Sequence, residues 1–187
     1  MNKDFMYGVG KVSINGVDVG YIKKESFDIN GQKGEVAKVE AEQVPGAAVL
    51  IIPQSNGTIA PKFILIHLKY ENIKQLSGGT VHYAKTDTEK NTPIGWTPQS
   101  ELLLLSGYVQ IDLVSGQSIL IPKAVLMSNL AGKLTLKETA EVDCAMEIEQ
   151  PSEGKPYGIF DTSSLPAKWV SDHIVPKDEL VEMTAKG

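Results

Sequence analysis

Short apolar runs separated by turn residues constrain the fold of this chain more than any other feature of its sequence. Segments rich in Val, Ile and Leu are interrupted by Gly, Pro and Asn-Gly pairs at fairly regular spacing. This pattern is typical of short β-strands joined by turns. We therefore expect a mainly β fold, a β-sandwich or open barrel, with one short flanking α-helix.

The first hairpin is predicted residue by residue from the segment KVSINGVDVG. A two-residue turn at Asn15-Gly16 sets Ile14 opposite Val17. On the other face it sets Ser13 opposite Asp18. Apolar side chains then meet apolar ones and polar side chains meet polar ones, as a type I′ turn in the correct register requires.

The last hairpin is predicted from the same kind of match. A three-residue loop over 138–140 sets Leu134 opposite Cys144. It also sets Leu136 opposite Val142, so that the apolar side chains share one face. Because a shift by one residue would turn the apolar set to the other face, this match decides the predicted register.

One stretch, KYENIKQLSGG, predicts a helix. Tyr70, Ile73 and Leu76 recur at a three-residue spacing, and Gly78-Gly79 offers a C-terminal stop. We expect a helix of two turns near residues 70–77. A helix this short is stable only when it packs against the sheet.

The remaining strands are predicted from their apolar runs. Residues 47–55 and 62–68 are apolar on both faces, as central strands of a sandwich are. Residues 86–98 are predicted as a loop. Further strands are expected at 81–85, 99–105, 107–114, 117–121, 124–131, 133–138 and 141–149.

Two segments differ from this β pattern. Residues 30–46 are charged, contain no aromatic residue and end in Pro45-Gly46, so they are predicted as a long loop or arm. The composition changes again after Asp161, where the chain is polar and has two prolines. We therefore expect a β domain over residues 1–161 and a C-terminal arm over residues 162–187.

Charge and hydropathy exclude several classes of protein. The 18 basic and 23 acidic residues give a net charge of −5, which disfavours general binding of nucleic acid. The apolar runs are too short to span a bilayer, and the first residues lack the apolar core of a signal peptide. We therefore expect a protein made in a cytoplasm, with no membrane partner.

Acidic residues cluster within residues 138–153, which contain no Lys or Arg. On an alternating strand, four of them share one face: Glu141, Asp143, Glu147 and Glu149. An ordinary solvated face is one interpretation. A calcium site is disfavoured, because these side chains follow a strand and are not gathered in a loop with a Gly turn.

Motifs of catalysis are missing from the sequence, which has no P-loop, G-x-S-x-G, H-E-x-x-H or paired C-x-x-C. His67 and His82 flank the predicted helix, and we interpret them as ordinary sheet residues because a metal site needs further ligands. Cys144 lies on an apolar strand face and is predicted to be a small buried hydrophobe. We therefore predict that the protein is not an enzyme and needs no metal or cofactor.

The two tryptophans suggest an alternative function. Trp96 lies in the predicted loop and Trp169 in the predicted C-terminal arm. Exposed aromatic rings could stack on sugars, so a monomeric carbohydrate-binding β-sandwich is the main alternative. Aromatic residues make up only 6% of the chain, and no row of them follows one strand face.

The order of elements resembles the tail tube proteins, or major tail proteins, of long-tailed phages. The resemblance lies in the hairpin VSINGVDVG, the helix ENIKQLSGG and the stretch ILIPKAVLMSNLAGKLTLKETAEVDCAMEIEQ, followed by PYGIFD. It covers residues 8–161. Tube proteins of contractile injection systems are related to the same family, so a phage, a prophage or an injection system would be the setting.

The resemblance implies a virion structural protein that self-assembles into stacked, hexameric rings. Its partners would be itself, other tail proteins, and DNA that passes through the lumen without specific binding. The protein would lie in the virion tail, and in the host bacterial cytoplasm before assembly. Residues 30–46 would order when rings dock, with Lys33, Glu35, Lys38, Glu40 and Glu42 at the contact. The acidic face of Glu141, Asp143, Glu147 and Glu149 would line the lumen and repel DNA phosphates.

Overall fold

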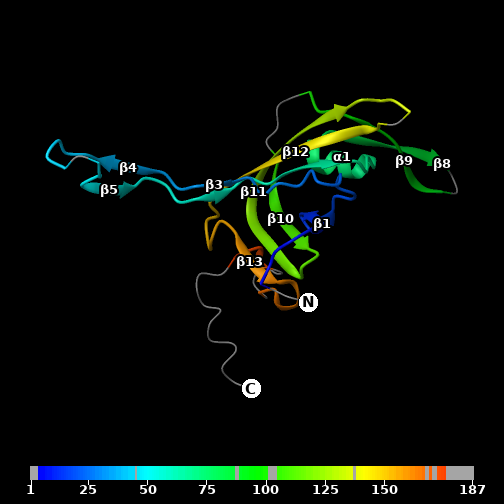
Figure 1. The fold of residues 1–187 in the computed structure, drawn as a ribbon. Coiled ribbons are helices and arrows are strands. Elements are labelled where there is room, and N and C mark those ends of the chain that lie inside the picture. Colours follow the sequence, from blue (N-terminus) through cyan, green and yellow to red (C-terminus); the bar gives the residue numbers. More distant parts are fainter. Residues whose placement is uncertain are drawn as a thin grey trace, which may run out of the picture.

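The computed structural model describes residues 4–44, 46–86, 89–100, 105–136, 138–166, 169 and 172–175. Over these residues the chain is mainly β, with several antiparallel sheets and one α-helix that is described along its whole length, as predicted (Figure 1). Part of the predicted strand 99–105 lies outside the described residues. None of the described helices is long and apolar enough to cross a membrane.

The main sheet is antiparallel and has seven strands. β13 (Gly158–Asp161) pairs with β11 beside the main path. In spatial order, the other strands are β2 (Val17–Asp18), β1 (Val9–Ile14), β10 (Leu105–Leu113), β11 (Gln117–Gly132), β12 (Ala140–Ile148) and β7 (Lys62–Leu65).

This sheet curls around one apolar core. Ile14 of β1 and Leu65 of β7 lie near opposite ends of the strand order, yet both are fully buried in the same cluster. The segment after β2 also bridges back to β7, where Ile22 pairs with Leu65 and Asp28 pairs with Lys62. The result is a curved sheet that forms an open barrel.

The predicted helix is confirmed as α1 (Tyr70–Ser77). Its apolar residues Ile73 and Leu76 are buried, and Gly78 follows with a φ of 69°, a value that glycine adopts without strain. Ser128 Oγ of β11 donates a hydrogen bond to the Leu76 carbonyl at 2.8 Å. The short helix is therefore stabilised by packing on the sheet.

The first hairpin is also confirmed, with Ile14 opposite Val17 and Ser13 opposite Asp18. The predicted register of the last hairpin is wrong. β11 is one long strand, and it sets Leu130 opposite Val142 and Ser128 opposite Cys144.

The predicted partners in that hairpin, Leu134 and Leu136, lie in the connection between β11 and β12 and are 83% and 107% exposed. The observed register differs from the predicted one by an even number of residues, so both keep the apolar residues of β12 on one face. The observed register also pairs β12 with the apolar run 124–131, which gives a longer ladder.

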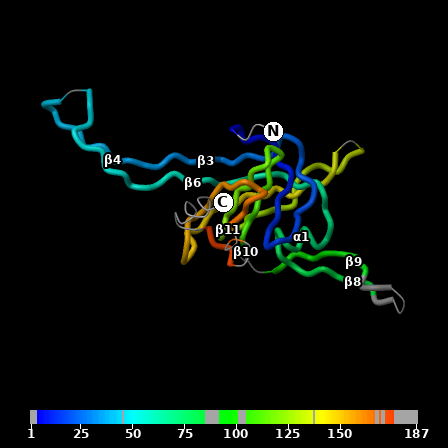
Figure 2. The backbone as a smooth tube through the Cα atoms, turned by 90° about the horizontal axis from the view of Figure 1, so that it is seen from below, coloured from blue at the N-terminus to red at the C-terminus, as the bar shows by residue number. Residues whose placement is uncertain are grey.

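Three smaller sheets complete the β structure. β8 (Thr80–Thr86) pairs with β9 (Glu89–Thr97), so the predicted loop 86–98 is mainly a strand. β3 (Gly31–Gln32) pairs with β6 (Thr58–Ile59), and β4 (Val36–Val39) pairs with β5 (Leu50–Pro53). The β8–β9 hairpin and the β3–β6 segment project from opposite sides of the barrel (Figures 1 and 2).

The start of the predicted C-terminal arm packs on the main sheet. A 3-10 helix, η1 (Thr162–Ser164), follows β13, and the Asp161 carboxylate accepts a hydrogen bond from the Ser163 amide at 3.2 Å. Beyond it, Trp169 and Val175 are buried against Leu120 of β11. These contacts form a second, smaller apolar cluster.

Candidate assembly surfaces

Residues 30–60, here called the arm, form a two-stranded ribbon that projects far from the barrel (Figures 1 and 2). Backbone hydrogen bonds join its two sides. The Val49 amide donates to the Val39 carbonyl at 2.8 Å, and the Gln54 amide donates to the Glu35 carbonyl at 2.8 Å. The predicted loop 30–46 is thus one side of the arm, and most of the predicted core strand 47–55 lies on the other side.

The prediction of a buried strand at 47–55 is wrong, because the apolar residues of the arm tip are exposed. We define the tip as β4, β5 and their connection. Seven large apolar side chains in it are between 44% and 56% exposed: Val36, Val39, Val44, Val49, Leu50, Ile51 and Ile52.

The register assigns these side chains to two faces. Val39 lies opposite Leu50, and Ala37 lies opposite Ile52, so one face of the β4–β5 pair is entirely apolar. On the other face Val36 lies opposite Pro53, and Lys38, its one charged residue, lies opposite Ile51. The tip therefore exposes apolar surface on both sides of a ribbon that is only two strands wide.

The five charged residues predicted for self-assembly are all exposed along the first side of the arm: Lys33, Glu35, Lys38, Glu40 and Glu42. Sequence reasoning missed the apolar partners on the second side. The run VLII, residues 49–52, was the available signal, but an apolar run has the same pattern in a core strand and in a strand that another molecule covers.

Polar contacts fix the root of the arm. The Asp28 carboxylate accepts a hydrogen bond from the Asn30 amide at 2.8 Å and lies 3.3 Å from Lys62 Nζ. Both contacts hold the pKa of Asp28 below its usual value, and the hydrogen bond from the Asn30 amide has the larger effect. Asn30 has a φ of 48°, which asparagine tolerates better than most residues do.

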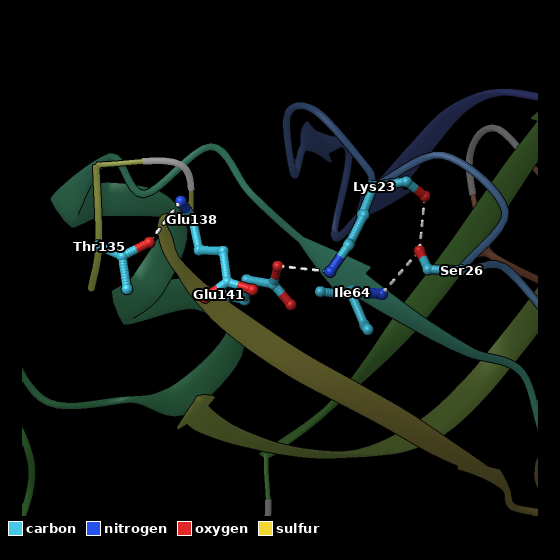
Figure 3. Close-up of polar contacts among 6 residues, drawn as sticks. All are labelled: Lys23, Ser26, Ile64, Thr135, Glu138 and Glu141. Carbon is cyan, nitrogen blue, oxygen red and sulfur yellow. Dashed lines mark hydrogen bonds and ion pairs between the residues drawn. The ribbon is translucent and has the colours of Figure 1, made fainter. Parts of the chain in front are cut away.

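A second set of contacts ties the root segment to the barrel (Figure 3). Ser26 Oγ donates to the Lys23 carbonyl at 2.7 Å and accepts from the Ile64 amide at 3.2 Å. Lys23 Nζ then reaches the Glu141 carboxylate of β12 at 2.6 Å. The segment that leads into the arm is therefore anchored to β7 and β12.

A groove of about 650 Å³ lies beside this root. Met6 and Tyr7 line it from the N-terminal segment, and residues 22–25 and 27–29 line it from the segment that leads into the arm. Its apolar lining includes Val9 and Leu113, which pack against the main core.

Three of the four acidic residues predicted to share a face lie in β12, where buried and outward residues alternate, and the fourth, Glu149, follows its last residue. The four acidic side chains nevertheless differ in their surroundings. Glu141 pairs with Lys23, and Glu149 pairs with Lys123 at 2.5 Å. Asp143 and Glu147 are exposed. Two of the four carboxylates are therefore neutralised by lysines that are distant in the sequence.

Other candidate residues have places within the fold. His67 stacks on Tyr21 with ring centroids 5.0 Å apart, and His82 Nε2 lies 3.0 Å from Thr97 Oγ1. Cys144 is buried as predicted, and burial raises its pKa to about 12. Among the residues that the structure describes, no group of three or more His, Cys, Asp or Glu side chains could hold a metal ion.

Neither tryptophan has the exposed ring that stacking on a sugar would require. Trp96 lies in β9 and not in a loop, and its Nε1 donates to the Gly78 carbonyl at 2.8 Å. Trp169 is 2% exposed and forms an edge contact with Tyr108. Both rings therefore serve contacts within the chain.

Comparison with known proteins identifies no relative, since no protein-family model and no curated protein matches the chain. The function is therefore inferred from the arm, the groove and the acidic strand.

Proposed function

We propose that this protein is a structural subunit that self-assembles through its arm into stacked rings, as in the phage tail tubes whose subunits its sequence resembles. The proposal rests on the arm tip, a two-stranded ribbon with apolar side chains exposed on both faces. A two-stranded hairpin is marginally stable alone in water, and a large exposed apolar patch marks an interaction site. Association would cover the tip.

The energetics favour repeated contacts over a single one. Full burial of a Val, Leu or Ile side chain stabilises by about 1.5–3 kcal/mol, and the seven tip residues are already half buried. About 1 kcal/mol per side chain, or roughly 7 kcal/mol in all, remains to be gained. Because association costs about 4 kcal/mol or more, one arm contact is weak, and a closed ring or stack is stable.

The acidic strand fits the lumen of such a tube. Asp143 and Glu147 are exposed on the outward face of β12. Repeated around a ring, these carboxylates would give a negative wall that repels phosphates and lets DNA slide. In this proposal the protein acts in a virion tail, does not bind DNA sequence-specifically and has no catalytic role.

The test is a double substitution in the tip, Leu50→Glu with Ile52→Glu. Both side chains are exposed and lie outside the main core, so the melting temperature and circular dichroism of the barrel should not change. We expect rings or tubes of the native protein in electron microscopy and only monomers of the variant. A matched control, Val17→Glu with Ile159→Glu, changes side chains that are 52% and 48% exposed on the barrel. Tubes of the tip variant indistinguishable from the native ones would refute the proposal.

The alternative, a monomeric carbohydrate-binding module, has less support. Its motivation was two exposed tryptophans, whereas Trp169 is buried and the indole N–H of Trp96 is bonded to the backbone. The carbohydrate-binding alternative would be supported if the protein stayed monomeric in solution and bound sugars on a glycan array.

A further inference from the structure

We propose that the groove at the root of the arm receives the arm tip of a second copy of this chain. The inference rests on the proposed self-assembly through the arm and names the surface that the arm contacts. Arm and groove would then be the two halves of one repeated interface.

The groove is an opening onto the apolar interior of the barrel. Val9, Ile22, Phe27 and Leu113 line it and are partly buried against the main core. Tyr7, at its edge, remains 50% exposed. An apolar occupant would extend the core outward and remove these side chains from water.

The arm of the same molecule does not fill this groove. Its root is fixed beside the groove by the contacts of Asp28 with Asn30 and Lys62. From that root the ribbon runs straight away from the barrel (Figures 1 and 2). An arm tip that fills the groove must therefore come from another copy of the chain.

The tip suits the groove in size and in apolar character. Its all-apolar face presents Val39, Leu50 and Ile52 from two adjacent strands. A groove of about 650 Å³ lies within the range that buries a compact apolar group, roughly 300–1,000 Å³. The charges that line the groove balance, Lys23 and Lys24 against Glu25 and Asp28, so the apolar face of the tip, and not its charge, would hold it in the groove.

A lipid surface fits the tip less well than a second copy does. Elements that lie in a membrane interface are rich in Lys and Arg and are anchored by Trp or Tyr. Residues 39–61 contain neither basic nor aromatic residues, and their two charges are negative. Anionic lipids would repel them.

Arm and groove are different surfaces of one chain, so the contact is head-to-tail. Such a contact has a free arm at one end and a free groove at the other, and it repeats until a ring closes or a stack ends. A subunit with an altered arm or an altered groove therefore stops growth of the assembly at that surface and does not merely weaken the contact.

This property gives a complementation experiment. The groove variant is Met6→Glu with Lys24→Glu, and the arm variant is Leu50→Glu with Ile52→Glu. Met6 is 42% exposed, so the first change places a charge in the groove without removing a core residue. Sedimentation velocity should show each variant alone as a monomer. An equal mixture should form a one-to-one dimer and no larger species, because one intact arm still meets one intact groove. Since this single contact is weak, a chemical cross-linker is added to the mixture and to each variant alone before sedimentation.

The outcomes separate this inference from the proposed function. If the groove variant assembles like the native chain while the arm variant does not, the arm docks elsewhere and only this inference falls. A mixture in which the cross-linker traps no more dimer than in either variant alone would overturn it too. If the arm variant itself assembles normally, the proposed function falls with it. Flotation of the native chain with phosphatidylglycerol vesicles, lost in the arm variant alone, would assign the tip to a lipid surface instead.

Discussion

At the scale of single residues, one carboxylate controls how the arm leaves the barrel. Asp28 caps the Asn30 amide and pairs with Lys62, and its pKa is lowered by both contacts. A lowered pKa means that the folded state favours the charged form. The stabilisation is therefore complete above the ordinary value of 3.8 and is lost as the pH falls through the lower pKa of the folded state.

We expect Asp28→Asn to loosen the arm root in a pH-dependent way. At pH 6 the Asn30 amide of the variant should exchange its hydrogen faster than that of the native chain, and the difference should vanish once the pH lies well below the pKa of Asp28. Asp18→Asn is the matched control, because Asp18 caps the Gly20 amide at 2.8 Å in the same geometry but on the barrel. Equal exchange at pH 6 in the native chain and the Asp28 variant would contradict this role.

At the scale of elements, close backbone contact shapes the middle of the arm. A Cβ atom at Gly34 would lie 2.6 Å from the Ser55 carbonyl oxygen, and one at Gly57 would lie 2.9 Å from the Gln32 carbonyl oxygen. Both distances are too short for real contacts, so the two sides of the ribbon can approach here only because these residues are glycines.

We expect Gly34→Ala to separate the two sides of the arm without unfolding the barrel. The Gln54 amide, which donates to the Glu35 carbonyl, should lose protection from hydrogen exchange by about tenfold or more. Gly31→Ala is the control, since a Cβ there meets no atom within 4 Å. Exchange of the Gln54 amide that is the same in both variants would show that the close approach is unimportant.

The elements that the sequence predicts correctly are those fixed by local signals. The Asn15-Gly16 turn sets the first hairpin, and the three-residue spacing before Gly78-Gly79 sets α1. Local signals do not fix the register of the last hairpin. Leu130 and Leu136 would each place an apolar side chain opposite Val142, so the apolar alternation fits both registers. Only the length of the ladder distinguishes them, and that depends on β11 being one strand.

The candidate site was predicted only in part for a related reason. Alternation placed Glu141 and Asp143 on one face of β12, but it could not show that Lys23 pairs with Glu141. An ion pair between residues so far apart in sequence depends on the curl of the sheet. Likewise, the apolar run 49–52 indicates burial but not the molecule that provides it, and the barrel leaves it exposed.

At the scale of the whole molecule, the arm and the acidic strand make a joint prediction about a tube. Assembly through the arm would repeat β12 around a ring, and its outward carboxylates would then act together. Glu141 and Glu149 are unsuitable for a test, since each holds a lysine. Asp143 and Glu147 are exposed on the same face and can be changed without breaking those pairs.

We expect Asp143→Lys with Glu147→Lys to leave the fold and assembly intact and to make the lumen retain DNA. Tubes assembled with short duplexes, then treated with nuclease, should keep protected DNA in this variant, and added salt should release it because phosphate contacts exchange with counterions. The native chain should keep none. The control, Glu71→Lys with Glu153→Lys, makes the same change of charge at exposed positions outside β12 and should bind DNA only where nuclease can reach it. If tubes of the β12 variant retain no protected DNA, the acidic face does not line the lumen.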